Sequence, residues 1–88
     1  MNTLNPTQVE RFKALFPELP EELADVVLLY AAGATQADIA AMAGLPSRKQ
    51  VACMLKSAAE KMELGSVQAI RIVVQNRLYF FLLDCLRR

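Results

Sequence analysis

The stretch ATQADIAAMAGLPSRKQVACMLKSAAEKM, residues 34–62, contains the signals that decide the fold. Thr35 followed by Asp38 is typical of a capping box at the start of a helix, with Asp in place of the commoner Glu or Gln. Gly44 is typical of a helix stop, and Ser47 is a suitable cap for a second helix after the corner LPS. The pattern predicts two helices joined by a tight corner, over residues 36–44 and 48–62.

The rest of the chain also has a helical pattern. β-branched residues are sparse outside RIVV, no Asn-Gly or Asp-Gly hairpin signal is present, and apolar residues recur at helical spacing. Asn5 can cap a first helix with Pro6 at its first position. Pro20 can open a second helix, Gly33 can end it, and Gly65 breaks the chain before the last one. We therefore expect an all-α fold, a small bundle of about five helices, over residues 6–16, 20–33, 36–44, 48–62 and 67–86.

Length and charge set further limits. The chain of 88 residues suits one small domain, and its hydrophobic content of 55% is high for that length. Its net charge of +1 is unevenly spread. Residues 1–43 carry two basic and six acidic side chains, a net charge of −4, whereas residues 44–88 carry eight basic and three acidic ones, a net charge of +5. This asymmetry permits a nucleic-acid-binding face on the C-terminal half.

The composition argues against several classes of function. Without His, a Gly-rich phosphate loop or a nucleophile beside a base, we expect no enzyme, no cofactor and no metal site. Arg77 and Asp84 interrupt the most apolar run, which argues against a membrane span, and the start MNTLNPTQVE lacks the pattern of a secretory signal. Cys53 and Cys85 are expected to be reduced thiols of a cytoplasmic protein, with a redox switch as the alternative.

A longer pattern surrounds the corner, from Leu19 to Leu78. Before the corner, the pattern has acidic and apolar positions at Asp25, Val26 and Leu29, then Gly33, Thr35 and the inward-facing Ile39. Beyond the corner it continues with Val51, Lys61, Met62, Leu64 and Ser66. This pattern resembles a LuxR-type (GerE-like) helix-turn-helix domain over about two-thirds of the chain, with one extra residue in PSRKQ. Region four of sigma factors is a weaker resemblance, because it is similar only as far as Met62 and predicts no LGSVQAIRIVV tail.

The resemblance implies an organisation and a function. Residues 1–18 would be an N-terminal helical extension, and residues 19–88 a LuxR-like domain with an extended C-terminal helix, in a single domain overall. The implied function is that of a small stand-alone bacterial transcriptional regulator that binds double-stranded DNA. In such a domain the second helix of the corner enters the major groove.

The helix over residues 48–62 has two faces. At about 100° per residue, the core stripe consists of Val51, Met54, Leu55, Ala58 and Met62. The opposite face presents Lys49, Ala52, Cys53, Lys56 and Glu60. Members of the family usually have basic or polar side chains at the positions of Ala37, Ala52 and Cys53, so the recognition helix of this chain is atypical.

The remaining candidates for DNA contact lie around the corner. They are Gln36, Ser47, Arg48, Lys49, Gln50, Lys56, Ser57 and Lys61. Basic side chains neutralise phosphates and polar ones bind base edges, although the same residues are also common as solvated surface groups. In one copy this set is small, because affinity for DNA depends on several phosphate contacts.

The last helix, within SVQAIRIVVQNRLYFFLLDCLRR, changes character along its length. Up to Gln75 it is amphipathic, with Gln68 and Arg71 on the same polar side. From Leu78 to Leu86 apolar residues encircle the axis, and a helix that is apolar all round is normally buried all round. We expect a symmetric homodimer through this helix, with the candidate interface residues Val74, Leu78, Tyr79, Phe81, Leu82, Cys85 and Leu86.

Two alternatives to this homodimer stay open. The first helix could fold back over the last one through Phe12, Leu15 and Phe16, which would leave a monomer. A larger transcriptional regulator could instead cover the apolar surface. The second alternative corresponds to a competing function, a degenerate helix-turn-helix module that binds another regulator and blocks or modifies it without binding DNA itself. A sigma-like or anti-sigma fragment that contacts RNA polymerase is a third hypothesis, supported only by the corner.

Overall fold

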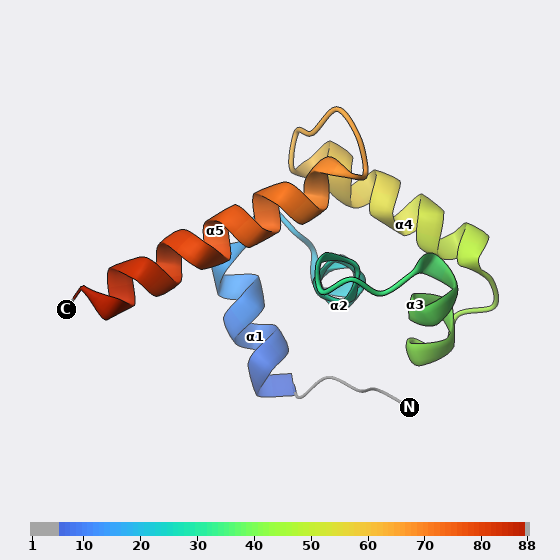
Figure 1. Cartoon of the computed structure of the whole chain (residues 1–88). Coiled ribbons are helices and arrows are strands. Elements are labelled where there is room, and N and C mark those ends of the chain that lie inside the picture. The colour runs from blue at the N-terminus through green and yellow to red at the C-terminus, as the bar shows by residue number, and fades with distance from the viewer. Residues whose placement is uncertain (1–5, 88) are drawn as a thin grey trace.

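The computed structural model describes residues 6–87, which form five α-helices and no strand (Figure 1). The helices are α1 (Pro6–Leu15), α2 (Glu21–Ala31), α3 (Gln36–Met42), α4 (Arg48–Lys61) and α5 (Ala69–Leu86). The predicted all-α class is confirmed, while the expected cap Asn5 lies outside the described residues. α5 begins at Ala69 rather than at residue 67. At this start, the side-chain oxygen of Ser66 accepts a hydrogen bond from the Ala69 N–H at 3.3 Å.

Three helices end on a residue with left-handed backbone geometry. Gly33 after α2 has a φ of 106°, Gly44 after α3 has 69°, and Glu63 after α4 has 59°. At the last of these ends the Leu64 N–H donates to the carbonyl of Ala59 at 2.8 Å, and matching bonds close α2 and α3. Both glycine stops were predicted from the sequence. The third was not, because glutamate gives no signal for a backbone conformation that glycine adopts most easily.

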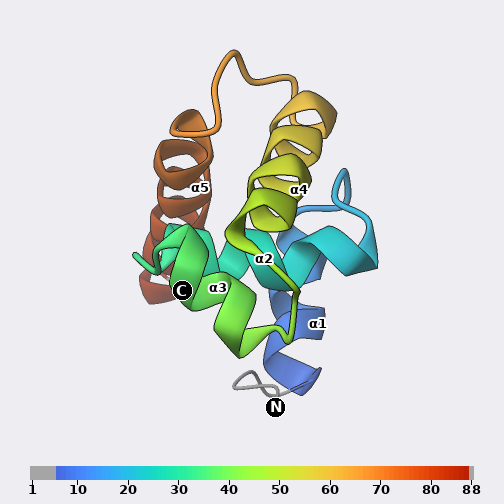
Figure 2. The ribbon, with the colours of Figure 1, turned by 90° about the vertical axis from the view of Figure 1, so that its right-hand side faces the viewer.

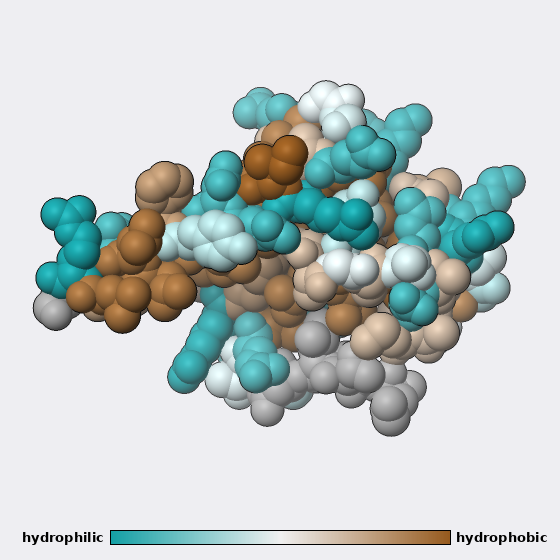
Figure 3. Space-filling model, viewed as in Figure 1, coloured by the Kyte–Doolittle hydropathy of each residue, from teal (hydrophilic) through white to brown (hydrophobic). Residues whose placement is uncertain are grey.

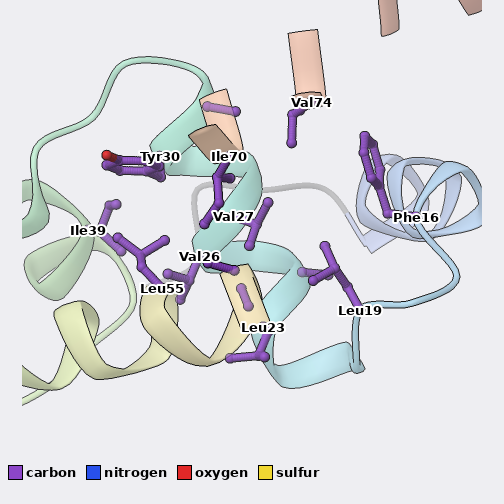
Figure 4. Close-up of a cluster of buried hydrophobic side chains, with 14 of the residues drawn as sticks. Phe16, Leu19, Leu23, Val26, Val27, Tyr30, Ile39, Leu55, Ile70 and Val74 are labelled. Atoms are coloured by element: carbon purple, nitrogen blue, oxygen red, sulfur yellow. The ribbon is translucent and has the colours of Figure 1, made fainter. Parts of the chain in front are cut away.

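α2 is the centre of the core, because all four other helices pack against it. Its buried side chains are Leu23, Ala24, Val26, Val27, Tyr30 and Ala31. Figure 4 shows Leu23, Val26, Val27 and Tyr30 of α2 in one cluster with buried residues from α3, α4, α5 and the α1–α2 connection, namely Phe16, Leu19, Ile39, Leu55, Ile70 and Val74. The core therefore unites the N-terminal region, the α3–α4 corner and the first half of α5.

α5 contributes only two fully buried side chains, Ile70 and Val74. Val74 was predicted to belong to an interface with another chain, and this is wrong. The side chain has no exposed surface because it packs onto the core inside its own chain (Figure 4). The periodicity of the helix predicted its inward direction, and the neighbouring α2 fills the space that a partner would need.

Two arginines attach α5 to the ends of α1 and α2. The Arg71 Nε donates to the Tyr30 carbonyl at 2.9 Å, and its guanidinium lies 3.9 Å from the centre of the Tyr30 ring. The Arg77 Nη1 donates to the Leu15 carbonyl at 2.9 Å and lies 3.0 Å from a Glu18 carboxylate oxygen. Carbonyls at the end of a helix lack partners within the helix, and cations are favoured there. The two arginines thus serve as caps for α1 and α2.

The C-terminal half of α5 projects beyond the other helices (Figures 1 and 3). Every residue from Tyr79 to Leu86 is exposed, including Phe80 at 66% and Leu86 at 73%. α1 packs on α2, with Phe12 of α1 and Phe16 just after it both buried in the core, and in this structure α1 does not fold over the end of α5. Within residues 6–87, no helix combines the length and the apolar character needed to cross a membrane.

Candidate nucleic-acid interface

The corner between α3 and α4 is fixed by local hydrogen bonds. The Asp38 N–H donates to the Thr35 hydroxyl at 3.1 Å, and the Thr35 N–H donates to the Asp38 carboxylate at 3.3 Å, which completes the predicted capping box. The Ser47 hydroxyl caps α4 by accepting from the Gln50 N–H at 3.4 Å. Leu45, half-buried, packs against the core between them. These contacts hold α3 and α4 side by side (Figure 2).

α4 turns one face to the core and the other to solvent. Val51, Leu55, Ala58 and Ala59 are buried. Lys49, Cys53, Lys56 and Glu60 are exposed. This is the division that the helical periodicity predicts, with Met54 and Met62 half-buried at its margins. The exposed face is therefore open to a ligand along several turns of the helix.

Part of the predicted DNA-binding set surrounds one shallow hollow between the start of α3 and the start of α4. Gln36, Arg48 and Lys49 line it, together with Thr35, Ala37 and Ala52. Its volume is about 640 Å³. Lys56 lies two turns further along α4 on the same side as Lys49, because residues seven apart nearly eclipse each other on a helix.

The other predicted residues lie elsewhere. Gln50, Ser57 and Lys61 form a second strip of α4, rotated by about 110° from the strip of Lys49 and Lys56. Gln50 and Lys61 are exposed, whereas Ser57 is half-buried. A helix in a groove can meet both walls, so the two strips suit opposite strands better than one flat surface. Ser47 stays at the corner, where its hydroxyl is already engaged as the cap.

Apart from the exposed Arg87 at the end of α5, the described basic residues of the C-terminal half fall into two groups. Arg71 and Arg77 are held by carbonyls of α1 and α2, so they are not available to a ligand. Arg48, Lys49, Lys56 and Lys61 are all exposed on α4 and have no ion-pair partner among residues 6–87. The basic surface is thus concentrated on α4. Two acids moderate it, Glu60 on α4 and the capping carboxylate of Asp38.

Sequence reasoning missed the part that small residues play in this hollow. Ala37 and Ala52 come from different helices and line the same space, where a long side chain from either would fill it. Ala52 is only half exposed, so the junction of α3 and α4 explains its size better than a position on a free face. Pairing of two alanines across a corner leaves no signal in a single sequence, because only the packing of the two helices brings them together.

Cys53 and Cys85 are both free and exposed thiols. Among residues 6–87, no three His, Cys, Asp or Glu side chains are grouped so that they could hold a metal ion. The chemistry that this surface offers is therefore that of cations, hydroxyls and amides. A scan of protein-family models and searches of curated proteins and of solved structures found no match to this chain.

Proposed function

We propose that the chain is a transcriptional regulator that binds double-stranded DNA through a LuxR-like helix-turn-helix formed by α3 and α4. α4 would lie in the major groove as the recognition helix, with the start of α3 against the phosphate backbone. The observation that carries this proposal is the group of exposed, unpaired cations on α4, namely Arg48 at its start and Lys49 and Lys56 along one side, next to a corner closed by two helix caps. Backbone contacts of this type supply most of the affinity in DNA binding.

One copy offers few phosphate contacts. The four cations of α4 correspond to about four neutralised phosphates, which predicts a slope of roughly −3.6 for the logarithm of affinity against the logarithm of salt concentration. Two copies would double the contacts and give a slope of roughly −7. We therefore include pairing of two chains through α5 in the proposed function. The exposed apolar end of α5 supports this pairing.

A salt titration tests the DNA contact. Fluorescence anisotropy would measure binding to a duplex from the promoter region of the gene that encodes the chain, between about 50 and 200 mM salt. Over this range, six to ten phosphate contacts change the affinity by about 10³ to 10⁵. Lys49→Ala is expected to weaken binding and to reduce the slope by about one for each chain in the complex. Lys13→Ala removes the same charge from α1, away from α4, and should leave both unchanged. Absence of binding at micromolar protein and low salt would contradict the proposal.

A second candidate function has its own observation. Ala52 and Cys53 leave α4 without strong readers of base edges, and Ala37 offers α3 no polar contact, while the end of α5 exposes a large apolar surface. These features favour an interaction module that binds and inhibits another transcriptional regulator, or contacts RNA polymerase. Co-purification of one stoichiometric regulator, with no change in DNA affinity for Lys49→Ala, would support it. A DNA-binding homodimer that is indifferent to other proteins would refute it.

A further inference from the structure

Two apolar surfaces of the chain have no partner in the structure. One is the tail, residues Tyr79–Leu86 of α5, which is brown and projecting in Figure 3. The other is the groove, an open apolar hollow of about 840 Å³ between α1, α2 and the middle of α5. Its lining residues are Gln8, Arg11, Phe12, Ala14, Leu15, Leu28, Leu29, Ala32, Leu78 and Phe81.

We infer that the tail of one copy of this chain docks into the groove of a second copy, and that the exchange is reciprocal. In this arrangement the two α5 helices cross antiparallel, and α1 forms part of the dimer interface. The inference rests on the pairing of two chains in the proposed function, and it does not depend on the DNA contact.

The shape of the tail favours a groove over a flat face. Its apolar side chains surround the helix axis, with Leu82 on the side that continues the line of Leu78, and Phe80 and Leu83 turned away from it. Side-by-side packing of two helices buries one stripe of each. A groove walled by three helices contacts a docked helix on several sides, so it can bury more of such a tail.

The groove cannot be filled by the tail of its own chain. α5 is one continuous helix from Ala69 to Leu86, and its residues Leu78 and Phe81 form a wall of the groove. The residues that follow therefore run past the groove and away from the molecule (Figure 1). Because the tail and the groove adjoin each other in every chain, two copies related by a twofold axis satisfy both surfaces at once and leave none for a third.

Charge complementarity favours a second copy as the occupant. The tail has a single charged residue, Asp84, and the groove has a single one, Arg11. Both are exposed, and neither has an ion-pair partner among residues 6–87. Docking of the tail brings the carboxylate into a groove bordered by the guanidinium.

The surface area is that of a stable dimer. Six large apolar side chains of the tail are between 51% and 73% exposed. At about 200 Å² for a large side chain, these fractions correspond to roughly 700 Å². The largest apolar patch on a typical monomer is about 300–600 Å², and a standard interface buries about 800 Å² of each partner. The tail thus supplies most of that area, and the groove residues other than Phe81 add to it.

Cysteine cross-linking between two differently tagged chains tests the docking. One chain carries Cys53→Ser and keeps Cys85 in its tail as the only thiol. The other carries Cys53→Ser and Cys85→Ser with one new thiol at the groove, from Gln8→Cys, Ala14→Cys or Ala32→Cys in separate variants. The three positions surround the groove, so a docked tail brings Cys85 within reach of at least one. Each mixture is oxidised, separated on a non-reducing gel and checked for folding by circular dichroism.

Matched controls place the new thiol outside the groove, with Glu10→Cys on α1 and Glu22→Cys on α2, both exposed positions. The expected result is a cross-linked pair of differently tagged chains from at least one groove variant, in at least about tenfold excess over both controls. Equal yields from groove and control thiols would overturn the inference. So would cross-links only between two Cys85 thiols, which would mean that the tails pair without entering the groove.

Light scattering on the unmodified chain separates this inference from the proposed function. A monomer at tens of micromolar protein would refute both the docking and the pairing through α5. A dimer in which no groove variant cross-links would refute the docking alone. The DNA titration with Lys49→Ala is independent of either result, because Lys49 is on α4, away from the tail and the groove.

Discussion

The two halves of α5 differ in burial, and the difference is the opposite of what their hydrophobicity suggests. The first half contains Arg71, Gln75 and Arg77, and yet it is anchored to the core through Ile70 and Val74. The second half contains the densest apolar run of the chain, and it is exposed. Polar side chains can dock a helix when carbonyls at the ends of other helices need donors. Apolar side chains remain exposed when no other element of the same chain reaches them.

The largest effect is expected from a truncation in the anchored half. Ile70→Ala removes buried methyl groups from a side chain with no exposed surface. The free energy of unfolding should fall by about 2–5 kcal/mol, because the lost burial and the new cavity both cost stability. Urea denaturation monitored by circular dichroism measures this. Ile72→Ala, on the same helix at 64% exposure, is the control and should change stability by less than about 0.5 kcal/mol. An equal loss from both variants would contradict the anchoring.

Polar substitution in the exposed half should separate association from folding. Phe80→Asp combined with Leu83→Asp places two charges on the tail, where the wild-type residues are 66% and 53% exposed. We expect the dimer dissociation constant to rise by at least about tenfold, which corresponds to about 1.4 kcal/mol. The helical signal of the monomer should be unchanged. Sedimentation of the variant at several concentrations measures the constant, and an unchanged dimer would show that the tail is not the interface.

Loss of an arginine cap should have an intermediate effect. Arg77→Ala leaves the Leu15 carbonyl and the Glu18 carboxylate without their donor. We expect a loss of about 1–2 kcal/mol, near the lower end for charged hydrogen bonds because the side chain is 38% exposed. Thermal unfolding at low protein concentration measures it. Arg11→Ala removes the same charge from a position without an ion pair and should change the stability of the monomer little. Similar losses in the two variants would argue that net charge matters and the cap does not.

The smallest effect is expected from reversing charges across the proposed dimer contact. Arg11→Glu and Asp84→Arg should each weaken dimerisation by a few-fold, since exposed ion pairs contribute about 0.2–1 kcal/mol. The double variant should restore the wild-type constant, because the pair is rebuilt with opposite polarity. Sedimentation at low salt is the sensitive measurement. Additive weakening in the double variant would show that the two residues do not meet.

The sequence predicted the local features of the candidate site well. The capping box of Thr35 and Asp38, the Ser47 cap and the left-handed Gly44 are all present as expected. The buried side of α4 also follows the predicted stripe, from Val51 to Ala58. The DNA contact and the pairing of two chains stay predictions. What could not be predicted is which candidate residues border the hollow, since that depends on where α3 packs against α4.

Local and distant interactions therefore decided different properties of this protein. The sequence by itself determined where most helices begin and end, because caps and stops are set by residues within about five positions of each other along the chain. The tertiary structure alone decided which cations are available, because Arg71 and Arg77 are bound to carbonyls of residues 37 to 62 positions away. It also decided that Val74 is core and Phe80 is surface. Periodicity gives the direction of a side chain along a helix, but only the neighbouring helices determine whether anything meets it there.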